Sequence, residues 1–345
     1  MRFIPFLVSA VLCIAGLHNA AAKTEQLATT PYRGAIVVNA ADGAVIFEDN
    51  ADAVGYPASV LKLMTLLLVI EKVDAGTVRL GDRVTVSAEA SKMGGSQVYL
   101  KQGEIFTIDE LLDALMVQSA NDAAVALSQH VAGSRDAFIQ MMNRKAQALG
   151  MKNTRFISEH GLPPGADKDP DVTTARDLAL LGRELARHPL VFRYTSIKER
   201  GFRNDTFIMR NHNNLLGVVD GVDGFKTGFF RAGGFSILAT AQRDGVRIIA
   251  AVLGSENRLL RDEKTKELLA AGFLAVPRPP PPPPVVEPPP TPAPEPTAPV
   301  GEEVATKSGG GWKIAIGLIA ALALAGIIAA RLRPPRDLKK DLMRR

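Results

Sequence analysis

The stretch Pro57-Ala58-Ser59-Val60-Leu61-Lys62-Leu63-Met64-Thr65 opens an apolar run that continues through Ile70 and stops near Gly76. A proline near the first turn and a glycine just past the end favour a helix of about four to five turns. On such a helix Ser59 and Lys62 share a face at roughly 5–6 Å. A serine hydroxyl becomes a nucleophile when a base takes its proton, and a neutral lysine amine can be that base. A Ser-x-x-Lys match arises by chance about once in a chain of this length, so the pair needs support from elsewhere in the sequence.

That support comes from two triplets further along the chain. Ser119-Ala120-Asn121 and Lys226-Thr227-Gly228 follow the serine–lysine pair in the order that is typical of penicillin-binding proteins and class A β-lactamases. Serine and asparagine are also common helix caps, and a second Ser-x-Asn at Ser255–Asn257 shows that the triplet alone proves little. The order of the three motifs therefore carries the interpretation.

With these motifs, residues from about Pro31 to Phe273 resemble the D-alanyl-D-alanine carboxypeptidases, the low-molecular-mass penicillin-binding proteins of serine peptidase family S11. Four further segments carry the resemblance: Met93-Gly94-Gly95-Ser96, Asp122-Ala123-Ala124, Thr174-Ala175-Arg176-Asp177-Leu178-Ala179 and Val222-Asp223-Gly224-Phe225. Strands at both ends with helices between them also suggest an α/β domain whose sheet unites its termini. The resemblance implies a β-lactamase/transpeptidase-like fold, with an antiparallel sheet flanked by an all-helical subdomain.

The resemblance also implies a role for each catalytic residue. Ser59 attacks the carbonyl between two terminal D-alanines and forms an acyl-enzyme, and β-lactam antibiotics acylate the same hydroxyl. Lys62 is the base for that step, although the identity of the base is disputed in related enzymes. Ser119 relays a proton to the leaving amine, and Asn121 holds the substrate amide and the lysine.

Five residues are expected to bind substrate. Lys226 adds positive potential that favours an anionic substrate and helps keep the catalytic lysine neutral. Thr227 can donate to the terminal carboxylate, and Gly228 allows close approach of the strand backbone. The N–H of Phe229 joins that of the nucleophile in an oxyanion hole. Arg261, on the last helix, stands where the family often has an arginine for the substrate carboxylate; the alternative is a solvated helix arginine.

The expected activity is a D,D-carboxypeptidase that trims the terminal D-alanine of peptidoglycan stem peptides. A D,D-endopeptidase that cleaves cross-links with the same residues is one alternative, and a catalytically dead wall-binding module is another. A β-lactamase is a third, although Glu159 lies in a plausible loop without the surrounding motif that a deacylating glutamate would have. The sequence also departs from the family, since Phe229-Phe230 follow the Lys-Thr-Gly triplet where relatives often have a polar residue and threonine.

The ends of the 345-residue chain predict export and membrane anchoring. Residues 1–22 form an expected signal peptide, with Arg2 before an apolar run and Ala20-Ala21-Ala22 at its end; an uncleaved anchor is the alternative. The catalytic domain is expected at 27–275, followed by a Pro-rich linker at 277–311 and a transmembrane helix at 312–331. The basic tail at 332–345 should stay in the cytoplasm, which places the catalytic domain on the periplasmic face.

The charge distribution, the cysteine and the histidines do not predict a nucleic-acid or metal partner. The formal charge of +5 arises largely from the C-terminal cluster, so it predicts membrane topology rather than nucleic-acid binding. Cys13 is the only cysteine and lies in the signal segment, so the mature chain is expected to lack disulfides and thiolate chemistry. The histidines of the mature chain, His130, His160, His188 and His212, show no metal-ligand spacing and are interpreted as surface or loop residues. No metal or cofactor is expected.

Overall fold

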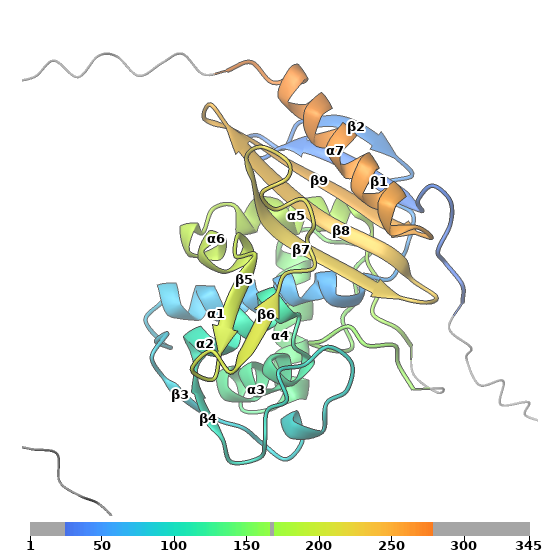
Figure 1. Cartoon of the computed structure of the whole chain (residues 1–345). Helices are drawn as coiled ribbons and strands as arrows, with labels where there is room; N and C mark the ends of the chain where they lie inside the picture. Colours follow the sequence, from blue (N-terminus) through green and yellow to red (C-terminus); the bar gives the residue numbers. More distant parts are fainter. Residues whose placement is uncertain (1–24, 166–168, 279–345) are drawn as a thin grey trace, which may run out of the picture. The chain divides into compact units, whose positions relative to one another are not determined.

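A five-stranded antiparallel sheet is the central element of the computed structural model, which describes residues 25–165 and 169–278 (Figure 1). Its strand order is β2-β1-β9-β8-β7, so β7 is an edge strand. The strands are β1 (Gly34–Asn39), β2 (Val45–Asp49), β7 (Val222–Phe230), β8 (Gly234–Arg243) and β9 (Val246–Ser255). The pairing of β1 with β9 joins the two ends of the domain in one sheet, as the sequence predicts.

Tight turn chemistry fixes the register of the longest hairpin. Strands β8 and β9 are joined at Asp244-Gly245, which have φ values of 47° and 79°. Two consecutive left-handed residues form the turn that matches the twist of a hairpin, and Asp-Gly favours it. The residue types of this turn therefore explain its geometry.

Helices cover both faces of this sheet (Figure 1). The helices are α1 (Lys62–Asp74), α2 (Ile108–Asp113), α3 (Asn121–Ala132), α4 (Arg135–Ala148), α5 (Ala175–Leu185), α6 (Pro189–Thr195) and α7 (Arg258–Ala275). Helix α7 packs on one face against β9 and β8, and α5 packs against β9 and β1 beneath the other face. Helices α1 to α4 form a helical subdomain with two small hairpins, which are β3 (Arg83–Thr85) with β4 (Ile105–Thr107) and β5 (Glu199–Phe202) with β6 (Phe207–Arg210). The predicted antiparallel sheet is thus confirmed, whereas the expectation of an all-helical subdomain is wrong, because these two hairpins pack among its helices.

Helix α1 is the centre of the helical subdomain. Every residue from Lys62 to Ile70 is buried, and the helix contacts α3, α4, α5 and α6. A helix that is apolar on all sides can be stable in a soluble domain only inside such a core. This burial holds the first turn of α1 at a fixed distance from the sheet edge.

Two helices have irregular ends, and the sequence predicts the first of these helices. Ser59 belongs to a 3-10 turn, η1 (Ala58–Leu61), that precedes α1, rather than to the α-helix itself. Side chains at positions i and i+3 nearly eclipse in a 3-10 turn, so this geometry points Ser59 and Lys62 to the same side. Helix α2 likewise does not continue as a regular α-helix and is followed by a π-helical turn, η3 (Ala114–Gln118).

The predicted signal peptide, transmembrane helix and basic tail lie outside the described residues, as does the linker beyond residue 278. Within 25–165 and 169–278, no helix combines the length and the apolar character that a membrane crossing requires.

Candidate active site

A cavity of about 450 Å³ lies where η1 meets the edge strand β7 and the N-terminus of α3. The predicted site residues that line it are Ser59, Ser119, Asn121, Thr227, Gly228, Phe229 and Arg261. The two remaining predicted residues, Lys62 and Lys226, are buried behind this surface. The structure therefore brings together three motifs that are spread between residues 59 and 228 of the sequence.

The serine lies in a turn with unusual backbone geometry. Ala58, immediately before Ser59, has a φ of 47°, in the left-handed region that a residue with a β-carbon rarely adopts. Such conformations are common at functional sites, where surrounding packing holds them. Here the turn sits between Gly161, whose missing side chain leaves room for the carbonyl of Ala58, and Gly228 of β7.

Lys62 is buried, and its amine contacts three oxygen atoms. Nζ lies 2.9 Å from Ser59 Oγ and 2.8 Å from Asn121 Oδ1, and it also donates to the backbone carbonyl of His160. Burial is the main reason that the pKa of Lys62 is well below its usual range, and the nearby charge of Lys226 lowers it further. These contacts and the lowered pKa therefore place a neutral Lys62 amine next to the serine hydroxyl.

One side of the cavity is formed by residues 93–100 and 118–121, which we call the loop wall. Asn121 donates from its backbone N–H to Ser96 O at 2.8 Å and from Nδ2 to Gly94 O at 2.7 Å. The second bond fixes the amide so that Oδ1 faces Lys62. Ser119 ends η3 with φ 62° and ψ 33°, a left-handed residue that turns its side chain into the cavity lining.

The other side is the strand wall, residues 226–230 of β7. Lys226 is buried and donates to Thr227 O at 3.1 Å, and the strand is held in register by pairing with β8. A β-carbon at Gly228 would lie 2.5 Å from Pro57 O and 2.9 Å from Ser59 N, so only glycine allows this approach. The strand wall thereby places its backbone directly beside the serine.

The electrostatic environment of the cavity favours an anion. Burial and the neighbouring charge of Arg261 lower the pKa of Lys226 to about 7. Arg261 is itself buried and binds Asp262 Oδ1 through Nε at 2.9 Å, so the alternative of a solvated helix arginine is wrong. Arg258 and His212 also line the cavity, and no carboxylate of the described residues does so.

Sequence reasoning did not predict how Arg135, Glu159 and His160 are arranged next to Lys62. Arg135 binds the carboxylate of Glu159 (Nε to Oε1, 2.6 Å; Nη2 to Oε2, 3.3 Å) and approaches His160 Nε2 at 3.0 Å. His160 lies in a loop, as expected, but it is buried, and burial with nearby Lys62 and Arg135 lowers its pKa to about 3. Its contact with Lys62 uses a backbone carbonyl, which no residue motif can reveal.

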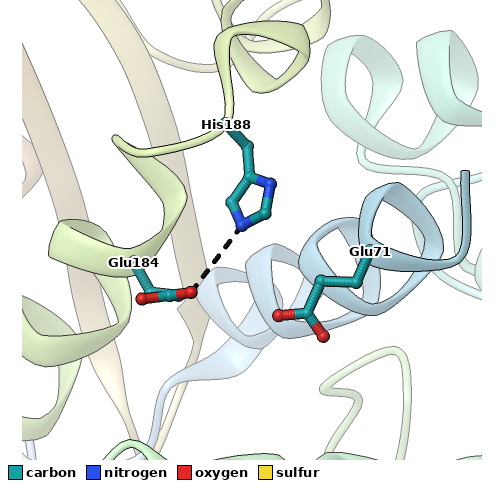
Figure 2. A group of neighbouring side chains, drawn as sticks. All are labelled: Glu71, Glu184 and His188. Atoms are coloured by element: carbon teal, nitrogen blue, oxygen red, sulfur yellow. Dashed lines mark ion pairs between the residues drawn. The ribbon is translucent and has the colours of Figure 1, made fainter. Parts of the chain in front are cut away.

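A separate group of potential metal ligands lies away from this cavity. Glu71 of α1, Glu184 of α5 and His188 bring their ligand atoms within 4.8 Å of one another (Figure 2). Glu71 already pairs with Lys145 at 2.6 Å, and His188 Nδ1 lies 2.7 Å from Asp74. We therefore interpret the group as part of a network of ion pairs between helices.

Comparison with known proteins places these features in a family. The family model for D-alanyl-D-alanine carboxypeptidase matches residues 20–257, a range that contains all three motifs. The chain is 33% identical over 254 residues to D-alanyl-D-alanine carboxypeptidase DacF of Bacillus subtilis, a match that covers 73% of this chain and 64% of the relative. It is 36% identical over 261 residues to DacC of Escherichia coli, covering 74% of this chain and 64% of the relative. The matched region thus spans less than two thirds of the length of these relatives.

Solved structures show the same fold. Penicillin-binding protein 5 of Haemophilus influenzae is similar with a TM-score of 0.66 and 30% identity, over 70% of this chain and 71% of that one. Penicillin-binding protein D2 of Listeria monocytogenes, in its ampicillin-bound form, is similar with a TM-score of 0.63 and 32% identity, over 70% and 97% of the two chains. With the family match covering well over half of the sequence, the chain belongs to the D-alanyl-D-alanine carboxypeptidase family.

Proposed function

We propose that this protein is a serine D,D-carboxypeptidase that removes the terminal D-alanine of peptidoglycan stem peptides through an acyl-enzyme on Ser59. The observation that carries the proposal is the surrounding of the Lys62 amine. A neutral amine has two N–H groups and one lone pair. Two of its three neighbours, Asn121 Oδ1 and His160 O, are carbonyl oxygens that can only accept hydrogen bonds. They take the two N–H groups, and the lone pair is left for the hydroxyl hydrogen of Ser59.

This arrangement gives a balanced first step. Lys62 takes the hydroxyl proton while Ser59 Oγ forms a bond to the carbonyl carbon, and the carbonyl π electrons move to its oxygen. The N–H groups of Ser59 and Phe229 stabilise that oxyanion, a geometry supported by the close approach of Gly228 to Ser59 N. As the carbon–nitrogen bond breaks, the proton passes from Lys62 to the leaving amine, with the hydroxyl of Ser119 as the relay.

The strand wall orients the substrate for this step. The terminal carboxylate accepts from Thr227, and Lys226 and Arg261 supply the positive potential that attracts it. The charge of Lys226 also opposes protonation of Lys62, which is the second cause of the low pKa of that lysine. Binding and activation of the base are therefore coupled through one side chain.

The position of Glu159 argues against a β-lactamase. Its carboxylate is held by the guanidinium of Arg135, and the residue is not among those that line the cavity. A glutamate in this position cannot activate a deacylating water next to the serine ester without first leaving the guanidinium. We therefore expect a penicillin to remain on the enzyme as a lasting adduct.

Intact-protein mass spectrometry after exposure to benzylpenicillin tests the proposal. A single adduct that maps to the peptide containing Ser59 and is absent from Ser59→Ala is the expected result. Prompt release of hydrolysed penicillin would point to a β-lactamase, and a protein without any adduct would point to a binding module. Release of D-alanine from a pentapeptide, compared with cleavage of a cross-linked dimer, separates the carboxypeptidase from the endopeptidase.

We further propose that the domain acts on the periplasmic face, tethered by the apolar segment at 312–331 through the Pro-rich linker. The support is sequence alone: an N-terminal export signal, and arginine and lysine residues on the C-terminal side of the apolar segment. Membrane fractionation of the full chain and of a chain that ends at residue 311 tests the tether. Recovery of both chains in the soluble fraction would contradict it.

A further inference from the structure

An unusual aromatic surface forms part of the cavity. Phe229, Phe230 and Phe235, which we call the aromatic shelf, all line the cavity. Phe229 and Phe235 are paired across β7 and β8, and their rings stack with centroids 4.2 Å apart and planes at 22°. Phe230 stacks on Tyr56 at 5.5 Å. Phe229 and Phe235 thus hold each other in place, and Tyr56 holds Phe230.

The ring of Phe229 remains open to solvent in spite of this packing. It is 55% exposed, although it belongs to a paired strand and lines the cavity. Leu162 and Pro163 add further apolar surface to the same cavity, and Leu162 lies next to Gly95 of the loop wall. An exposed phenyl ring in a preformed cavity is suited to cover an apolar group of a ligand.

The order of residues along β7 indicates which part of the ligand this is. On the proposed function, the terminal carboxylate lies at Thr227 and the scissile carbonyl lies beside Gly228 and Ser59. Thr227 and Phe229 are two residues apart on one strand, so they face the same side about 7 Å apart. The part of the ligand that contacts Phe229 therefore lies on the acyl side of the scissile bond.

The charge of the cavity decides which apolar groups fit. Lys226, Arg258 and Arg261 place positive charge on or next to it, which opposes a free ammonium group over the ring in spite of cation–π attraction. From these observations we infer that the aromatic shelf is a specificity subsite for an uncharged apolar or aromatic group on the acyl portion of the substrate. In a stem peptide this group is the side chain of the residue before the two D-alanines, with its amine acylated rather than free.

The inference rests on the proposed function, and two penicillins test it. Benzylpenicillin and 6-acetamidopenicillanic acid share nucleus, carboxylate and amide, and only the first carries a phenyl ring. We expect the native protein to be acylated about tenfold faster by benzylpenicillin, a ratio of the size that burial of part of one ring provides. Phe229→Ser should reduce that ratio to near one, and Phe229→Leu should keep most of it.

Leu259→Ser is the matched control, because Leu259 is an exposed apolar side chain of α7 that does not line the cavity. It should keep the native ratio. A ratio that Phe229→Ser leaves unchanged, in a protein that still forms the adduct, would overturn the subsite alone. Absence of an adduct from either penicillin with the native protein would overturn the proposed function and the subsite with it.

A peptide pair tests the charge rule in the same variants. Nα,Nε-diacetyl-Lys-D-Ala-D-Ala and Nα-acetyl-Lys-D-Ala-D-Ala differ only in the side-chain amine, which is neutral in the first and charged in the second. The acetylated peptide should be cleaved about tenfold more efficiently by the native protein, and Phe229→Ser should reduce the preference. Equal or reversed selectivity of the native protein would contradict the inference.

Discussion

The two walls of the cavity are built by different means. The strand wall is part of a continuous backbone ladder, in which Lys226, Thr227 and Gly228 pair with consecutive residues of β8. The loop wall has no such ladder, and side-chain hydrogen bonds hold much of its backbone instead. The buried carboxylate of Asp122 accepts from Leu100 N–H at 3.0 Å, and Ser96 Oγ donates to Gln118 O at 2.6 Å.

This difference predicts how each wall fails. A ladder of buried backbone hydrogen bonds keeps its geometry when a single side chain is removed. The position of the strand wall should therefore change chiefly when a substitution adds atoms to it. A loop held by side-chain bonds opens locally when one of them is lost, since each contributes about 1 kcal/mol or more. Lys62 sits between the walls, hydrogen-bonded to the loop wall and electrostatically coupled to the strand wall.

The largest expected effect follows from removing the base that the two walls share. Lys62→Arg replaces the neutral amine with a permanent cation, because a guanidinium does not lose its proton in proteins. Acylation by benzylpenicillin should fall by about 10²–10⁴-fold, the usual contribution of a positioned base. Stopped-flow or mass-spectrometric acylation rates measure this. A variant that keeps more than a tenth of the native rate would show that another group takes the proton.

Addition of one carbon should damage the strand wall. The β-carbon of Gly228→Ala would meet Pro57 O and Ser59 N and push the serine turn away from the strand. A displacement of about 1 Å in a reacting group can cost about a hundredfold, and we expect a loss of that order in acylation rate. Gly94→Ala on the loop wall is the control, because a β-carbon there meets nothing within 4 Å. Equal losses in both variants would contradict the proposed difference between the walls.

The features that sequence could predict are mostly local. Thr107 and Glu110 form a capping box, Thr174 caps α5, and Asp244 with Gly245 closes the hairpin. In each case the residues that interact are close in sequence, so residue type and spacing contain the information. The contact between Ser59 and Lys62 is of the same kind.

The features that escaped prediction are contacts between distant segments. The contact of Lys62 with His160 uses a backbone carbonyl, which every residue possesses, and it spans nearly a hundred positions. The order of Arg135, Glu159 and His160 in space follows from the packing of α4 against the loop after it, and no spacing rule describes that packing. The prediction that the three motifs meet in one cavity rested on family resemblance rather than on a physical pattern in the residues.

A clamp on the loop wall offers a further test of the comparison. Arg203, at the tip of the β5–β6 hairpin, donates to Val98 O at 2.5 Å and Tyr99 O at 2.9 Å and pairs with Glu104. Its guanidinium also lies 5.3 Å from the ring centre of Phe106. Arg203→Met should lower the acylation rate about tenfold and increase amide hydrogen exchange in residues 93–104, because the loop that holds Asn121 loses its outer support.

The matched control for the clamp is Arg210→Met in the same hairpin. Arg210 makes an ion pair with Glu199 in which both side chains are largely exposed, and such pairs contribute little. It should leave acylation within about twofold of native. Faster exchange in the loop without any change in acylation would show that the clamp serves stability rather than the site.

The smallest effect concerns the charge on the strand wall and appears as a change in pH dependence. Acylation requires Lys62 neutral and Lys226 charged. Because the pKa of Lys226 is about 7, its ammonium is lost as the pH rises through that value, and the second-order acylation rate should then decline several-fold. The rate should also fall as the pH drops through the lowered pKa of Lys62, because the amine then gains a proton. Lys226→Arg retains its charge at every accessible pH, so the alkaline decline should disappear even if the larger side chain lowers the absolute rate.

The measurement is the shape of the rate profile between about pH 5 and pH 10, with free benzylpenicillin as the probe. If the alkaline decline persists in Lys226→Arg, another group causes it. The strand wall would then act on Lys62 through its shape rather than through its charge.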